Sequence, residues 1–289
     1  MNTDSTDSTA GAEGTGGAGG TGGAAPGRPV LVTGGTGTLG RQVVRRLLDR
    51  QRAVRVMSRR ARPAGDRAPY EWASCDLAKG RGIDAAVAGV DTIVHCATTL
   101  TGDDEAAARR LLGAVRESDT ELRHFVYVSI VGIDRVPLGY YRRKLAAEGV
   151  LESSGLPYTV LRTTQFHDLI ALMATCQRRL PVVFTLSGVS FQPVDSGEVA
   201  DRLVELAQAE PAGRVADMGG PEVRTARDLA RSTLDAYVRR RRVVPLRLPG
   251  RAFGAYRAGG HLAPERAVGR LTFEDHLAAT GGSAGRPAR

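Results

Sequence analysis

The sequence lacks the long apolar runs and the paired cysteines that would assign it to a membrane or a disulfide-rich class. None of its apolar runs reaches the ~18 residues that a transmembrane helix needs, so no membrane span is expected. Its cysteines, Cys75, Cys96 and Cys176, are odd in number and scattered, and they match neither a disulfide framework nor a metal-ligand spacing. We therefore expect reduced thiols in a cytoplasmic protein that binds no metal.

Lysine is also almost absent. Only Lys79 and Lys144 accompany 38 arginines in a chain with a formal net charge of +9. The densest basic run, residues 238–244, has no interleaved aromatic residues, and charge runs of this kind are usually solvated. We expect a solvent-exposed face or a strand edge there, and no nucleic-acid partner.

What the chain does contain is an alternation of short strands and helices between two tails. Residues 1–27 and 280–289 are Gly-rich segments that bury too little apolar surface to order, and they are predicted to be disordered. Strands are expected at 29–34, 53–59, 70–77, 91–98, 124–132 and 157–163, and helices at 38–51, 82–90, 104–118 and about 140–154. This alternation predicts an α/β fold with a Rossmann-like, doubly wound parallel sheet, and a dinucleotide-binding core over residues 28–163.

After residue 163 the alternation of strands and helices becomes less regular. Helices are expected near 164–178, 196–210, 225–240 and 272–279, with strand-like stretches at 181–195 and 242–250. Residues 164–279 are therefore predicted to form a small C-terminal lobe on the substrate side, partly woven back onto the core.

A glycine loop follows the first strand directly and opens the first helix. In VLVTGGTGTLG (residues 30–40), three glycines stand three residues apart, which suits a tight turn, a close approach of backbone to a pyrophosphate, and a helix packed tightly on the sheet. The free N–H groups of the helix N-terminus would bind the phosphates. The predicted nucleotide contacts in this loop are Gly34, Thr36, Gly37, Thr38, Leu39 and Gly40.

The end of the second strand indicates which nucleotide is bound. An NAD site places an acidic residue there to bond the ribose 2′-hydroxyl, but this chain has Ser58, Arg59 and Arg60 instead. Donors and positive charge suit a 2′-phosphate, so NADP(H) is favoured over NAD(H). Asp76, followed by Leu77, could accept from the adenine amino group or serve as a helix N-cap.

Tyr140 and Lys144 stand four residues apart at the start of a predicted helix, on one face. A tyrosine that must donate a proton near neutral pH is limited by a pKa of about 10, and a neighbouring ammonium lowers that pKa by favouring the phenolate. Lysine suits this role better than arginine, because it is a compact charge on a flexible stem. Tyr141 is also within reach of Lys144, so the acid could be either tyrosine, with Tyr140 favoured on spacing.

The segments TGGTGTLG, HFVYVSIVG, YYRRK and ESSGLPYTVLRTTQF together resemble the short-chain dehydrogenase/reductase superfamily, and more closely its atypical NmrA-like branch of NAD(P)H-binding proteins. The resemblance covers roughly residues 29–280. It implies that Tyr140 is the general acid, that Lys144 holds the nicotinamide ribose and that Ser129 bonds the substrate carbonyl. Ser129 lies only 11 residues before Tyr140, a shorter connection than is typical.

Residues at the ends of later strands are expected to complete the site, because parallel sheets bind ligands at their carboxyl edge. Ala97 and Thr98 are small enough for cofactor contacts, whereas His95 is expected to be a packed strand residue. The candidates for the substrate pocket are Gln165, Phe166 and His167, with core packing as the alternative for Phe166. Residues 191–195 could close the pocket, with Gln192 as a further candidate.

These features predict an oxidoreductase that moves hydride between NADP(H) and a small carbonyl, alcohol, quinone or enone substrate. One alternative is a non-catalytic NAD(P) sensor of the NmrA-like kind, since this branch often lacks the tyrosine. A second is a nucleotide-sugar epimerase or dehydratase, which would need tightly held NAD and is disfavoured by the arginines after the second strand. A homodimer is possible; the substrate is not identified by the sequence.

Overall fold

The central element is a seven-stranded parallel sheet with the strand order β3-β2-β1-β4-β5-β6-β9. The computed structural model describes residues 27–98, 103–237 and 240–281. The strands of this sheet are β1 Val30–Thr33, β2 Val54–Ser58, β3 Glu71–Ser74, β4 Thr92–His95, β5 His124–Ile130, β6 Tyr158–Thr163 and β9 Gly213–Arg214. The order reverses direction at β1, where β4 lies opposite β2, so the predicted Rossmann-like doubly wound fold is confirmed.

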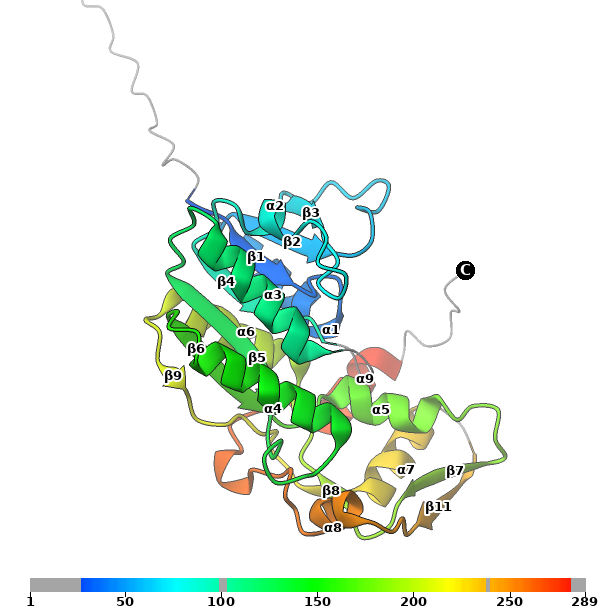
Figure 1. The fold of residues 1–289 in the computed structure, drawn as a ribbon. Helices are drawn as coiled ribbons and strands as arrows, with labels where there is room; N and C mark the ends of the chain where they lie inside the picture. The colour runs from blue at the N-terminus through cyan, green and yellow to red at the C-terminus, as the bar shows by residue number, and fades with distance from the viewer. Residues whose placement is uncertain (1–26, 99–102, 238–239, 282–289) are drawn as a thin grey trace, which may run out of the picture.

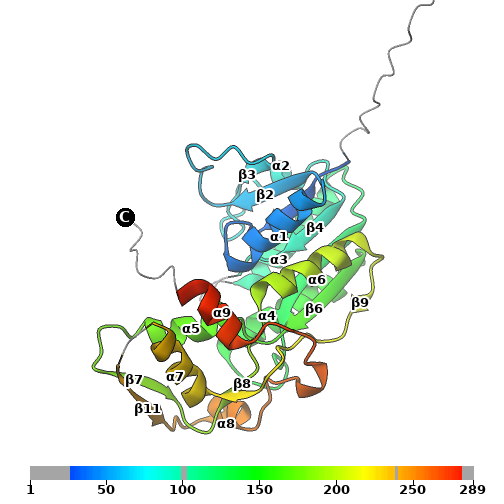
Figure 2. The same cartoon turned by 180° about the vertical axis from the view of Figure 1, so that it is seen from behind.

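Helices cover both faces of the sheet because successive strand residues point to opposite sides. Leu31 packs with the helices on one face, whereas Val30 and Val32 pack with those on the other. The first face carries α2 Ile83–Val87, α3 Asp104–Glu117 and α4 Gly139–Glu152, seen in front in Figure 1. The second carries α1 Thr38–Asp49 and α6 Ser196–Gln208, seen in front in Figure 2.

The rest of the chain forms a smaller lobe beside the carboxyl edge of the sheet, in the lower part of Figure 1. Its helices are α5 His167–Thr175, α7 Ala226–Ala236, α8 Arg251–Arg257, the short 3-10 helix η1 Pro264–Arg266 and α9 Phe273–Gly281. Its strands are β7 Val182–Leu186, β8 Ser190–Phe191, β10 Arg224–Thr225 and β11 Arg242–Leu246; β7 pairs with β11 in parallel and β8 with β10 antiparallel.

The chain after residue 163 does not stay in the lobe. Helix α6 packs on the sheet against α1, and β9 adds the seventh strand beside β6. Helix α8 was not expected from the sequence. Residues 1–26 and 282–289 of the two predicted tails lie outside the described residues, and α9 extends to Gly281. The proposed boundary at residue 163 stays a prediction.

The basic run 238–244 leads into an edge strand. Residues 238 and 239 lie outside the described part of the chain, and β11 begins at Arg242, which is exposed. Arg241 donates to the main-chain oxygens of Gln177 and Leu180, at the turn that follows α5.

Candidate cofactor and active site

The glycine loop has the geometry of a cradle that side chains would fill. Gly34 has φ +65°, and a Cβ there would lie 2.8 Å from the backbone of Ala97. A Cβ on Gly40 would lie 2.1 Å from the Gly34 carbonyl oxygen, so α1 can approach the loop this closely only with glycine at position 40. The N–H of Gly37 donates to that same oxygen at 2.9 Å and closes the turn. Helix α1 then begins at Thr38 with no side-chain cap, which leaves its N-terminus available to a phosphate.

The end of β2 presents two arginines to solvent. Arg59 and Arg60 are exposed, and the buried Ser58 hydroxyl accepts from the Arg60 N–H at 3.2 Å, which shapes the turn. The Trp72 indole donates to the Arg60 carbonyl oxygen at 3.1 Å. The loop that would meet a 2′-phosphate is therefore held by the neighbouring strand, while its guanidinium groups face outward.

Asp76 is engaged in a turn. Its Oδ1 accepts from the N–H groups of Ala78 at 3.0 Å and Lys79 at 3.2 Å. These bonds hold a turn and not a helix N-terminus, because α2 begins only at Ile83, with Gly82 as its N-cap. Leu77 is buried in the core with Ile83. A contact of Asp76 with adenine, through its other oxygen, stays a prediction.

Lys144 is buried between α4 and β5. Its ammonium donates to the Tyr127 hydroxyl at 3.0 Å and to the Val128 carbonyl oxygen at 3.1 Å, and lies 4.4 Å from the centre of the Tyr127 ring. Only 3% of Lys144 is exposed. A lysine ammonium is a compact charge on a flexible stem, and here it donates to two acceptors in a buried position. Tyr127 was missed by the sequence analysis.

Tyr140 lies in the first turn of α4, and its hydroxyl reaches the segment that joins β4 to α3. Its hydroxyl is 2.9 Å from Thr98 Oγ1, and Thr98 donates to Asp104 Oδ2 at 2.7 Å. Thr98 was expected as a cofactor contact only, and Asp104 was not expected at all.

The pKa of Tyr140 does not follow the expected direction. Burial raises it above the usual value, although the Lys144 charge and the Thr98 hydrogen bond both lower it. Lys144 does lower the pKa of Tyr140, as expected, but desolvation of the phenolate outweighs the attraction of the ammonium, so the net shift is upward.

Ser129, near the end of β5, carries an unsatisfied hydroxyl. The residue is 2% exposed, and its Oγ has no hydrogen-bond partner in the described part of the chain. A buried polar atom without a partner costs about 1–3 kcal/mol. Such an atom at the carboxyl edge of the sheet is suited to a ligand that supplies the missing hydrogen bond.

Tyr141 faces the lobe instead. It is 4% exposed and accepts from Tyr256 OH at 2.9 Å and from Gln165 Nε2 at 3.4 Å. Burial raises its pKa, and the groups that lower it are Tyr256 and Gln165, not Lys144. These contacts favour Tyr140 over Tyr141 as the acid. Tyr256 comes from α8, and nothing in the sequence indicated it.

The three predicted pocket residues fall into two groups. Gln165 lies beside Tyr141, and its Oε1 is buried with no hydrogen-bond partner among the described residues. Phe166 packs against the core, and His167 is fully buried, with Nε2 3.1 Å from the Leu271 carbonyl oxygen and its ring 5.6 Å from the Phe273 ring. The packing contacts of Phe166 and His167 are what the structure shows; their contact with a substrate stays a prediction.

Gln192 and His95 also have structural contacts. The Gln192 amide donates to the carbonyl oxygens of Gly220 and Ala263 and ties two loops together. Burial, aided by the Lys144 charge, lowers the pKa of His95 to about 3, and its Nδ1 lies 2.9 Å from the Thr33 hydroxyl. His95 is therefore a neutral, packed strand residue, as expected.

The fold and the glycine cradle define a dinucleotide-binding α/β protein of the Rossmann type. The chain belongs to the NAD(P)H-binding family, whose sequence pattern matches residues 34–210. The placement in the atypical short-chain dehydrogenase/reductase superfamily is confirmed, and the NmrA-like branch within it stays a prediction.

Individual relatives differ in what their names describe. A Streptomyces griseus protein named (4-alkanoyl-5-oxo-2,5-dihydrofuran-3-yl)methyl phosphate reductase is 29% identical, over 69% of this chain and 70% of its own. An Arabidopsis thaliana chloroplast protein named for a high chlorophyll fluorescence phenotype is 33% identical over 49% of this chain. The crystal structure of an Escherichia coli NADPH-dependent quinone oxidoreductase with NADPH has a TM-score of 0.73 at 18% identity, covering 86% of this chain and 99% of that one.

The alignments with the plant and algal relatives are partial. They span 39% of the Arabidopsis protein and 63% of a photosystem II assembly factor from Trieres chinensis, which is 27% identical over 66% of this chain. Within the described residues, no helix is long and apolar enough to cross a membrane. The cytoplasmic location and the homodimer stay predictions.

Proposed function

We propose that this protein is an NADPH-dependent reductase of a quinone or a conjugated carbonyl compound. The observation that carries the proposal is the convergence of three features at the carboxyl edge of one sheet. They are the Gly34–Gly40 cradle, the half-buried Tyr140 and the Ser129 hydroxyl, which has no partner in the part of the chain that the structure describes. The two relatives named as reductases of a quinone and of an oxo-dihydrofuran support this class of substrate.

Each group in the site would have its own role in the reduction. The bound nicotinamide would supply the hydride. Ser129 would donate a hydrogen bond to the substrate oxygen and so polarise the carbonyl. Tyr140 would deliver the proton to that oxygen, a general-acid step worth typically about 10²–10⁴-fold. Lys144 is buried against Tyr127 and Val128 of β5. Its positive charge would stabilise the phenolate that forms when Tyr140 gives up its proton.

The preference for NADPH rests on Arg59 and Arg60. Both are exposed at the end of β2, where a ribose 2′-substituent would lie, and residues 58–60 include no acidic residue. A phosphate there would gain charge-assisted hydrogen bonds that a hydroxyl cannot match.

The test is a titration of the purified chain with NADPH, NADP⁺, NADH and NAD⁺, followed by Trp72 fluorescence. Trp72 is the single tryptophan and bonds the Arg60 carbonyl oxygen, so it reports on the loop in question. Tighter binding of NADPH than NADH, followed by NADPH oxidation with quinones or enones, supports the proposal. If none of the four nucleotides binds, the proposal is wrong.

A second function is favoured by one specific observation. One relative is named as an assembly factor rather than as a reductase, so the same fold could serve as an NAD(P)-sensing protein that binds a partner. NADPH binding without turnover of any quinone or enone would favour that function. The epimerase alternative requires retained NAD, and purified protein free of bound nucleotide would exclude it.

A further inference from the structure

The net positive charge of the chain is concentrated in two segments of the C-terminal lobe. Residues 169–194 and 236–264 together contain nine arginines and no acidic residue. This excess equals the formal net charge of the whole chain, +9, so basic and acidic residues balance over the rest of the sequence. A field of one sign that extends over several elements attracts an oppositely charged partner.

The structure brings these two segments together at the outer end of the lobe. Strands β7 and β11 pair in parallel, with residues 242–246 beside residues 182–186. The turn after α5 is hydrogen-bonded to both strands. Gln177 Nε2 donates to the Phe184 carbonyl oxygen at 2.9 Å, and Arg241, just before β11, donates to the Gln177 carbonyl oxygen at 2.7 Å. In Figure 1 the two strands lie at the lower edge of the lobe, whereas β2 and its arginines lie in the upper part of the molecule.

The arginines at this end of the lobe face solvent without acidic partners. Arg178 and Arg179 are exposed in the turn after α5. Arg240, Arg242 and Arg247 are exposed in β11 and next to it. None of the five forms an ion pair with any residue that the structure describes. Their guanidinium groups are therefore available to an external anion, and they suit phosphate, which they can bond in a bidentate way.

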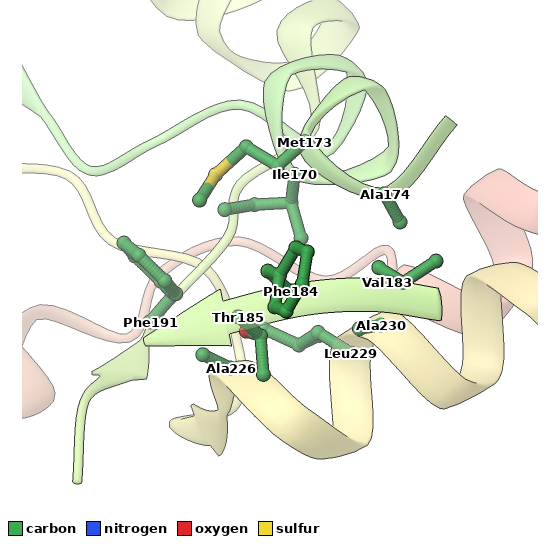
Figure 3. Close-up of a pocket in the computed structure, with 10 residues that line it drawn as sticks. All are labelled: Ile170, Met173, Ala174, Val183, Phe184, Thr185, Phe191, Ala226, Leu229 and Ala230. Carbon is green, nitrogen blue, oxygen red and sulfur yellow. The ribbon is translucent and has the colours of Figure 1, made fainter. Parts of the chain in front are cut away.

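Exposed apolar side chains lie among these arginines. Leu180 in the turn is 43% exposed, Phe184 in β7 is 40% exposed and Leu246 in β11 is 41% exposed. The space beneath β7 offers them no partner, because α5 and α7 pack there around a hollow of only about 20 Å³ (Figure 3). Apolar groups that gather on a surface in this way are typical of an interaction site.

The combination of arginines and aliphatic side chains favours the surface of an anionic phospholipid bilayer over other acidic partners. At such a surface arginines meet lipid phosphates, and apolar side chains beside them gain by entering the boundary between head groups and acyl chains. A nucleic acid offers the arginines phosphate but offers leucine little, because its bases stack on aromatic rings. A protein strand added to β11 would meet Pro245, which has no N–H to donate.

We infer that the outer end of the lobe is a docking surface for an anionic phospholipid membrane. It is formed by the turn 177–180 and by the paired strands β7 and β11. The arginines attract the lipid phosphates, and Leu180, Phe184 and Leu246 enter the interface, so the protein lies on the membrane without spanning it. The surface is separate from the glycine cradle and does not depend on the proposed reductase function.

The first experiment measures binding of the full chain to lipid vesicles by co-sedimentation. Vesicles of equal parts phosphatidylcholine and phosphatidylglycerol should bind at least about tenfold more tightly than pure phosphatidylcholine. Arg178→Gln/Arg242→Gln should weaken binding to the anionic vesicles roughly 25-fold, because each arginine near such a surface contributes about fivefold. The control Arg109→Gln/Arg202→Gln removes the same charge from the exposed faces of α3 and α6 and should change binding less than about twofold.

Two results of this experiment overturn the inference. Equal binding to both kinds of vesicle, or equal losses in the two double variants, would mean that no surface of the lobe is specific for anionic lipid. A duplex DNA oligomer that binds as tightly as the anionic vesicles, and that is weakened by Arg178→Gln/Arg242→Gln, would assign the arginines to nucleic acid instead.

The second experiment places a fluorescent probe beside the arginines. Cys176 is exposed directly before the turn, whereas burial raises the pKa of Cys75 to about 11 and that of Cys96 to about 12, so a maleimide should label Cys176 selectively. The emission of nitrobenzoxadiazole on Cys176 should shift to the blue on anionic vesicles, because the label leaves water. The same label on α6, in Cys176→Ser/Arg202→Cys, should not shift. A shift on α6, or none at Cys176, overturns the inference.

Discussion

At the scale of single residues, the two adjacent tyrosines differ most in what surrounds them. Tyr140 is half-buried, forms a hydrogen bond with Thr98 and is influenced by the Lys144 charge, whereas Tyr141 is buried and bonded to Gln165 and Tyr256. The sequence alone could place the Tyr–Lys spacing but could not separate these environments. The difference predicts distinct kinetic effects.

Tyr140→Phe should lower kcat for quinone or enone reduction by about 10²–10⁴-fold, because it removes the proton donor. Binding of NADPH should change little. Tyr141→Phe should retain most of the chemical step and chiefly affect KM, because that hydroxyl bonds the lobe. Steady-state kinetics on both variants checks this, and equal losses of kcat would contradict the assignment.

The arginines after β2 give a second prediction at this scale. Arg59→Ala and Arg60→Ala should each weaken NADPH binding by roughly ten- to a hundredfold, since a hydrogen bond to a charged group contributes about 1.5–3 kcal/mol. NADH binding should be unaffected. Arg52→Ala, in the turn before β2, serves as the charge control. Equal weakening of NADPH and NADH would refute the 2′-phosphate role.

At the scale of elements, helix α4 is held in place by a buried ion network. Arg162 on β6 donates from Nε to Glu148 Oε1 at 3.0 Å and from Nη2 to Oε2 at 2.6 Å, and from Nη1 to Asp134 at 2.8 Å. Glu148 lies one turn after Lys144 on the same helix. The network therefore positions the helix that carries both Tyr140 and Lys144.

Arg162→Met should reduce the free energy of unfolding by about 3–5 kcal/mol, because it leaves the Glu148 carboxylate buried without its partner. The double variant Arg162→Met/Glu148→Leu should recover much of that loss. Urea unfolding measures both. Arg202→Ala, which breaks the exposed pair with Glu205, should cost less than about 1 kcal/mol. A loss below 1 kcal/mol for Arg162→Met would show that the network contributes little.

The regular elements of the nucleotide-binding half were predictable because their signals are local. β-branched runs, helical spacing and the glycine loop are contiguous, and β1, α1, β2, β4, β5 and β6 lie within the expected ranges. In the lobe, α8 was missed because RAFGAYR is short and Gly-containing, and it is held by the packing of Tyr256 against Phe191 and His261. Because α8 was not expected, its residue Tyr256 was not expected near the site either.

At the scale of the whole molecule, buried histidines couple stability to pH. Burial lowers the pKa of His95 to about 3 and that of His261 to about 4, and it also lowers the pKa of His124 and His167. Between the folded and unfolded pKa values the unfolded chain binds more protons, so stability falls as pH falls. The contribution is fully present above about pH 6.5 and is lost progressively below it.

The free energy of unfolding should therefore decrease from pH 7 to pH 5, with a slope approaching about 1.4 kcal/mol per pH unit for each of His95 and His261 below pH 6. Urea midpoints at pH 7, 6 and 5 check this. His261→Gln should flatten the slope by about one histidine's share. A stability that is constant or rises toward pH 5 would contradict the assignment.

The sequence by itself determined the class of protein: a strand, a glycine loop and a helix are contiguous, and their backbone alone makes the nucleotide cradle. It also determined the Tyr140–Lys144 spacing, which helix geometry places on one face. Only the tertiary structure decided that Lys144 bonds Tyr127, that the Ser129 hydroxyl finds no partner within residues 27–98, 103–237 and 240–281, and that Tyr141 meets Tyr256, 115 residues away. The reason is physical: desolvation and hydrogen-bond satisfaction depend on which distant segments meet, and no local pattern of residues carries that information.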